Sequence, residues 1–81
     1  MQTRSMQFVK RIPKENAYRW YRVSVQSDLF DDYVLIREWG RLGHRSRGQR
    51  HAEPFTDESA ALQAFEAAVI KRLQRGYQID S

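Results

Sequence analysis

Residues 39–50 read WGRLGHRSRGQR and separate a part of the chain rich in strand-forming residues from a helix-forming part. Trp39, Gly40 and Arg41 bring a large aromatic ring, a glycine and a cation together where a strand pattern ends. Small domains often carry their binding residues at such exits from regular structure. Residues 39–50 are therefore the candidate functional stretch. The alternative is that Trp39 fills the core and Arg41 is a solvated surface charge.

Three segments around this stretch have the alternating pattern of strands. In residues 18–26, aromatic and β-branched side chains fall on alternate positions, which is typical of a half-buried strand. Residues 33–39 predict a second strand, apolar on both faces, with Arg37 and Trp39 on the same face. Residues 6–12 predict a shorter strand. These patterns indicate an antiparallel sheet.

The strand expected over residues 18–26 has one ambiguous face. Tyr18 and Trp20 fall on the side that otherwise carries polar residues. Residues 6–12 could cover this aromatic pair, or the pair could be exposed. Cover by residues 6–12 is the favoured interpretation.

Residues 49–55 predict a return strand antiparallel to residues 33–39. Pro54 confines this strand to a sheet edge or ends it, because proline cannot donate a ladder hydrogen bond. Residues 77–79 are candidates for a short last strand.

A helix is expected over residues 57–75, with Thr56 as its N-cap and Gly76 as its terminator. Apolar residues recur at three- and four-residue spacing and form one stripe: Ala61, Leu62, Phe65, Ala68, Val69 and Leu73. This apolar stripe must be buried, and the predicted sheet is the surface against which it can pack. The predicted fold class is therefore α+β, a twisted antiparallel sheet of about four strands packed around one long C-terminal helix. We expect a single domain over residues 1–81, with its core at about 18–77.

Composition narrows the possible functions. The chain has 81 residues, no cysteine and a formal charge of +4, so cysteine-based metal sites and disulfides are excluded. No apolar run approaches the roughly 20 residues that cross a bilayer, and the first residues lack the apolar core of a secretory signal. We therefore expect a soluble, cytoplasmic, basic protein with no membrane partner.

The positive charge is concentrated beside the tryptophan. Arg41, Arg45, Arg47 and Arg50 fall in a stretch without any acidic residue, which favours contact with a polyanion. A solvated loop would show the same charges and is the alternative. Arginine pairs with phosphate in a bidentate way, and a tryptophan offers a flat face for a base or a sugar. Together with Arg37 and Trp39, these residues predict a nucleic-acid-binding surface.

Catalytic and metal chemistry find little support in the sequence. No nucleophile elbow, phosphate-binding glycine loop or apolar pair of carboxylates is recognisable. His44 and His51 stand seven positions apart among arginines that oppose a divalent cation. We therefore predict no enzyme activity, no catalytic residues, no metal site and no cofactor.

A longer pattern resembles the WGR domain, which is named after its Trp-Gly-Arg signature. The resemblance covers residues 18–77 and rests on these residues in this order: Tyr33, Leu35, Trp39-Gly40-Arg41-Leu42-Gly43, Gly48-Gln49, Phe55 and Arg75-Gly76-Tyr77. It implies a small α+β fold of the stand-alone bacterial type. The WGR domain of DNA-damage-responsive poly(ADP-ribose) polymerases is similar and contacts DNA at strand breaks. The resemblance implies that Trp39 packs on the sugar-phosphate backbone near a terminus, and that Arg41 connects DNA binding to neighbouring domains.

Two functions remain open after these observations. The first is a non-enzymatic nucleic-acid-binding module that prefers DNA to RNA and contacts the backbone or an end, with Trp39, Gly40, Arg41, Arg37, Arg45, Arg47 and Arg50 as its site. The second is a protein-interaction or regulatory module that uses the same surface, because Trp and Arg are enriched at interaction hot spots. Burial of Trp39 against the helix would leave only the arginines available.

Overall fold

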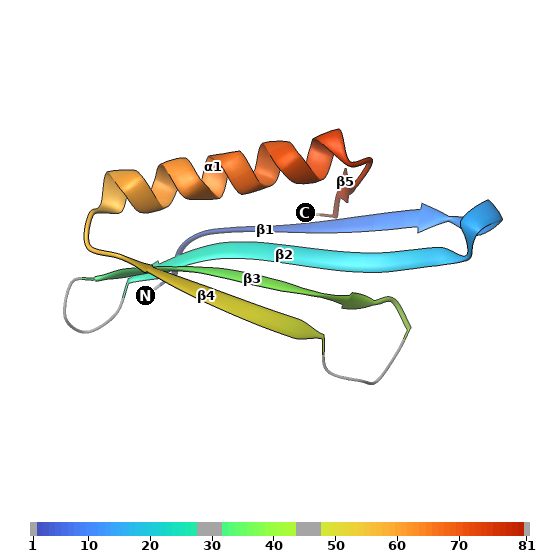
Figure 1. Ribbon diagram of the computed structural model, residues 1–81, viewed down its shortest axis with the longest axis horizontal. Coiled ribbons are helices and arrows are strands. Elements are labelled where there is room, and N and C mark those ends of the chain that lie inside the picture. Colours follow the sequence, from blue (N-terminus) through green and yellow to red (C-terminus); the bar gives the residue numbers. More distant parts are fainter. Residues whose placement is uncertain (1, 28–31, 44–47, 81) are drawn as a thin grey trace.

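The computed structural model describes residues 2–27, 32–43 and 48–80. The elements in chain order are β1 (Gln2–Ile12), the 3-10 turn η1 (Pro13–Glu15), β2 (Ala17–Ser27), β3 (Tyr33–Arg41), β4 (Gln49–Phe55), α1 (Glu58–Gln74) and β5 (Gln78–Ile79). The strands form one antiparallel sheet in the order β4-β3-β2-β1-β5. Figure 1 shows α1 running along one face of this sheet. The predicted α+β fold is confirmed, and residues 77–79 contribute the short fifth strand.

The core lies between α1 and the sheet face that it covers. The most deeply buried side chains come from three adjacent central strands and include Phe8, Val23, Val25 and Leu35. The helix contributes Ala61, Phe65 and Ala68. Each strand sends every second side chain to this face, so the alternation in the sequence translates directly into the core.

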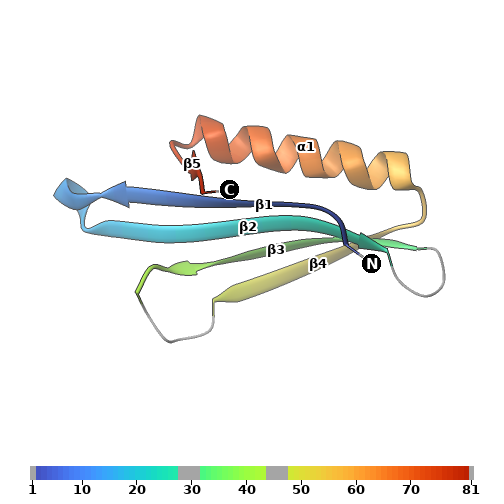
Figure 2. The same cartoon turned by 180° about the vertical axis from the view of Figure 1, so that it is seen from behind.

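The sheet has two edge strands, β5 on one side and β4 on the other. Figures 1 and 2 show β5 beside β1 near the C-terminal end of α1, while β4 lies on the far edge of the sheet. Pro54 is therefore on an edge strand, as predicted, opposite Val34. The sheet end that carries Trp39 and Arg41 lies near the C-terminal turn of α1.

The prediction that residues 6–12 cover Trp20 was wrong. This segment belongs to β1, which pairs edge to edge with β2 and places Val9 beside Trp20. Trp20 instead packs over two glycines. A Cβ atom added to Gly40 would lie 2.7 Å from Trp20 Nε1, and one added to Gly48 would lie 2.7 Å from Trp20 Cζ2. Gly40 therefore remains within β3, and its missing side chain makes room for the indole.

The helix begins at Glu58, one residue later than predicted. The backbone at Asp57 is extended, and Asp57 Oδ1 accepts a hydrogen bond from the Ser59 N–H at 3.3 Å. Asp57, not Thr56, is the N-cap, because the residue with a non-helical backbone immediately before the first turn takes that role. Leu73 also departs from the predicted stripe and is 45% exposed.

Replacement of Asp57 by alanine should lower the free energy of unfolding by about 1 kcal/mol. The change removes the acceptor for Ser59 and a negative charge from the helix N-terminus. Thr56→Ala is the matched control and should change stability by a few tenths of that amount. Urea unfolding followed by circular dichroism measures both, and an equal loss in the two variants would contradict the assignment of the cap.

Candidate functional site

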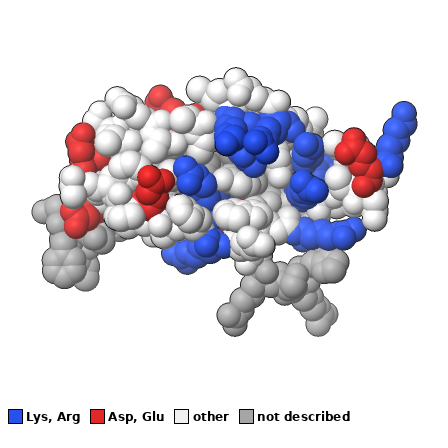
Figure 3. All heavy atoms as spheres, in the orientation of Figure 1, with Lys and Arg blue, Asp and Glu red and all other residues white. Residues whose placement is uncertain are grey.

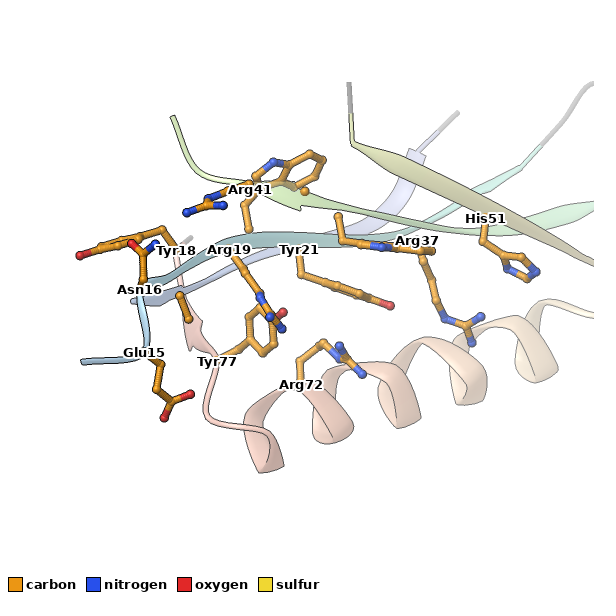
Figure 4. A pocket seen from close by; sticks show the side chains of 14 residues that line it. Glu15, Asn16, Tyr18, Arg19, Tyr21, Arg37, Arg41, His51, Arg72 and Tyr77 are labelled. Atoms are coloured by element: carbon orange, nitrogen blue, oxygen red, sulfur yellow. The ribbon is translucent and has the colours of Figure 1, made fainter. Parts of the chain in front are cut away.

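An open groove of about 700 Å³ lies where the end of the sheet meets the C-terminal turn of α1. Figure 4 shows its lining from close by, with side chains from β2, β3, β4 and α1. Five aromatic residues line it: Tyr18, Trp20, Tyr21, Trp39 and Tyr77. Four arginines also line it: Arg19, Arg37, Arg41 and Arg72. Among the described residues, Glu15 is the one carboxylate of the lining, so the groove is strongly basic.

The charge distribution of the whole face agrees with this lining. Figure 3 shows Lys and Arg side chains gathered on the half of the face that includes the C-terminal part of α1, while most Asp and Glu side chains lie toward the other end. A cleft lined by one sign of charge focuses the electrostatic field and attracts counter-charged ligands.

Trp39 is half-buried and forms part of a layered stack. It pairs across the strands with Tyr21, and the two rings are stacked with centroids 5.9 Å apart and planes 14° apart. The Arg72 guanidinium lies over the Tyr21 ring, 4.4 Å from its centroid. Trp39 therefore packs on Tyr21 and still lines the groove, so it is not closed off by the helix.

Arg72, in the last turn of α1, and Tyr77, just after the helix, both line the groove. Gly76 adopts a φ of +89°, and the Tyr77 N–H donates to the Arg72 carbonyl oxygen at 3.0 Å. This left-handed turn after the helix is the one that glycine favours. It brings Tyr77 edge-on to Tyr21, with centroids 6.0 Å apart. Lys10 Nζ secures the same turn by donating to the Arg75 carbonyl oxygen at 2.7 Å.

Arg37 lies at one end of the groove and Arg41 at the other (Figure 4). Arg37 is partly buried, and its Nη1 is 3.7 Å from Glu53 Oε1. Arg41 is exposed and sits beside Arg19 across β2 and β3. The candidate residues Trp39, Arg37 and Arg41 thus share one face of the sheet.

Other predicted site residues are placed differently. Arg50 pairs with Glu38 in the sheet, which puts it on the face opposite Trp39. Gly40 contributes backbone and leaves space for Trp20. Arg45 and Arg47 lie outside the described residues. The described residues therefore do not bring Arg50 together with Trp39, because one step along a strand reverses the face.

Sequence reasoning missed Arg19, Tyr21, Arg72 and Tyr77 as groove residues. A signal for Arg72 was present, since the spacing Phe65, Ala68, Arg72 continues the buried stripe of α1. An arginine on an apolar stripe indicates an unusual environment. Tyr21 belongs to the core and is only 7% exposed, yet it also lines the groove.

The Tyr21 hydroxyl is held in its protonated form. Burial raises the pKa of Tyr21 above its ordinary value of 10.0, while the positive charges of Arg72 and Arg37 oppose this rise. At neutral pH the hydroxyl is therefore a hydrogen-bond donor between two guanidinium groups. This geometry suits an anionic acceptor.

Within residues 2–27, 32–43 and 48–80, no three His, Asp or Glu side chains are grouped so that they could hold a metal ion. None of the helices in that part of the chain is long and apolar enough to span a membrane.

Comparison with known proteins identifies the family of this chain. The sequence profile of the WGR domain matches residues 4–81. The uncharacterized protein y4dW of Sinorhizobium fredii is 35% identical over 72 residues, which cover 88% of this chain. The chain spans only 34% of the length of that relative. Because the profile match extends over nearly the whole sequence, the chain belongs to the WGR domain family.

Proposed function

We propose that the protein is a non-enzymatic nucleic-acid-binding module that prefers DNA to RNA and contacts the backbone or an end of the duplex. One observation carries the proposal: the groove combines four guanidinium groups with stacked aromatic rings and a single described carboxylate. Arginine recognises phosphate through paired N–H donors, and aromatic rings accept bases or sugars. The family also supports it, because WGR domains are in general nucleic-acid-binding modules.

The role of each residue follows from its place in the groove. Trp39 would pack on a sugar or base with the part of its indole that Tyr21 leaves open. Arg41, at the exposed mouth of the groove, would contact a backbone phosphate. Within residues 2–27, 32–43 and 48–80 there is no free recognition helix, since α1 buries one face against the sheet. Contacts to the backbone position a protein without reading sequence, so we expect little base specificity.

Trp39→Ala and Arg41→Ala should both weaken binding to a linear duplex with a 5′-phosphorylated end. Loss of one aromatic packing contact should reduce affinity by about five-fold or more. Loss of one phosphate contact should reduce the slope of log K against log salt by about 0.9. Fluorescence anisotropy with a labelled duplex at several salt concentrations measures both effects, with circular dichroism to show that each variant is folded.

Arg50→Ala is the matched control, because it removes the same charge from the opposite face of the sheet. A closed circular duplex of similar length separates end binding from backbone binding. Tighter binding to the linear duplex establishes end recognition, whereas equal, salt-sensitive binding leaves backbone contact alone. If neither duplex binds at low salt, the proposal is wrong, and the same Trp and Arg surface becomes a candidate site for a protein partner.

A further inference from the structure

Arg72, on the inner wall of the groove, has no carboxylate partner among the residues that the structure describes. In the same part of the chain, nothing accepts a hydrogen bond from its buried Nε. Arg72 as a whole is only half-buried, so the rest of its guanidinium can be reached from the groove, and a cation in a partly desolvated site favours a bound anion.

The packing of Arg72 leaves its donors available to such an anion. Its guanidinium is 4.4 Å from the Tyr21 ring centroid and 5.5 Å from the Tyr77 ring centroid. A cation–π contact is an electrostatic attraction to the ring face and does not require a hydrogen bond from the guanidinium. The aromatic residues therefore hold Arg72 in the groove, and its terminal N–H groups make no hydrogen bond to any described residue.

Arg37 supplies a second cation, which lies beyond the hydroxyl end of the Tyr21 ring (Figure 4). Figure 4 shows the Tyr21 hydroxyl pointing toward Arg37, with Arg72 beneath the ring. The carboxylate of Glu53 is 3.7 Å from Arg37, and its side chain is 44% exposed. A long, exposed ion pair of this kind contributes little, so an incoming anion can replace Glu53 as the partner of Arg37.

We propose that Arg72, Arg37 and the Tyr21 hydroxyl form a subsite for one phosphate ester group, next to the surface where Trp39 packs. Two guanidinium groups and a hydroxyl donor that line the same hollow match the acceptor oxygens of a phosphate. The inference rests on the proposed function: if the protein binds nucleic acid, the phosphate in the subsite is one of the backbone phosphates. A free phosphate-bearing small molecule has the same chemistry and is the other source.

The first experiment examines the subsite without nucleic acid. Inorganic phosphate is added to ¹⁵N-labelled protein, with chloride at the same ionic strength as the reference, and the arginine Nε–H resonances are followed by NMR. Phosphate should shift the resonances of Arg72 and Arg37 and leave Arg75 unaffected, because Arg75 does not line the groove. Glu53→Gln should tighten phosphate binding by releasing Arg37.

The second experiment uses the labelled duplex and the variant Arg72→Met, which keeps the apolar stem on Tyr21 and removes the charge. Affinity for the duplex should fall about ten-fold, and the salt slope should decrease by about 0.9. Arg75→Met removes the same charge from the same end of α1 and should have a much smaller effect. Arg72→Lys should restore part of the affinity, since lysine keeps the charge but not the planar fork.

Thermal unfolding separates this role from a purely structural one. Arg72→Met eliminates Nε, a buried donor that no described residue satisfies, so Tm should stay equal or rise while binding weakens. A lower Tm with unchanged duplex affinity would mean that Arg72 only supports the fold, and would overturn the inference.

The two proposals fail in different ways. If phosphate shifts Arg72 and Arg37 but no duplex binds, the subsite stands with a small molecule as its ligand, and the proposed function is lost. If the duplex binds and Arg72→Met weakens it no more than Arg75→Met, while phosphate leaves the Arg72 resonance unchanged, the phosphate subsite is wrong and the proposed function survives.

Discussion

Phe65→Ala should lower the free energy of unfolding by about 3–5 kcal/mol. Phe65 is 5% exposed and belongs to the core cluster that joins α1 to the sheet. A chain of 81 residues has a total stability on the order of 4–12 kcal/mol, so the variant should be close to unfolding. Thermal unfolding followed by circular dichroism should show Tm reduced by more than about 12 °C.

The effect of Phe65→Ala reaches the groove as well as the core. Two helical turns connect Phe65 to Arg72 on the same side of α1, so a helix that loosens from the sheet withdraws Arg72 from Tyr21. Ile70→Ala is the matched control, because Ile70 lies on the same helix and is 53% exposed. The control should change stability by less than about 1 kcal/mol. A similar loss in both variants would contradict the core-packing explanation, because alanine favours the helix in both cases and only Phe65 is buried.

Gly40→Ala should lower the free energy of unfolding by about 1–3 kcal/mol through overpacking. The new methyl group would lie 2.7 Å from Trp20 Nε1, 3.0 Å from Trp20 Cε2 and 3.1 Å from Gly48 Cα. The indole would have to move away from both glycines. The central residue of the Trp-Gly-Arg motif is therefore explained by packing on the face opposite Trp39. Urea unfolding of the variant measures the cost.

A double-mutant cycle identifies the cause of that cost. In a Trp20→Leu background, much of the penalty for Gly40→Ala should disappear, because the nearest atoms belong to the indole. The part that remains reports the contact with Gly48. If the penalty is the same in both backgrounds, Gly40 is needed for a reason other than the space taken by Trp20. Binding to the duplex, corrected for the folded fraction, should change less than stability does.

The resemblance to the WGR family, stated from motif order alone, is confirmed by the profile match across residues 4–81. The predicted pattern of strands and helix is confirmed as well. Such patterns are local: alternation of side chains defines a strand, and three- and four-residue spacing defines a helix. The assignment of Trp39 and Arg37 to the same face also required only the count of residues along β3.

The composition of the groove was decided by tertiary structure. Arg72 stands 33 positions after Trp39 in the sequence, and it enters the Trp39–Tyr21 stack only because α1 crosses the covered face of the sheet (Figure 4). The register of β3 and β4 places Arg50 on the face opposite Trp39, although the two residues are close in the chain. Sequence by itself determined the elements and the motif. The packing of the helix on the sheet determined which charges surround Trp39, because contacts between distant segments depend on how whole faces fit together.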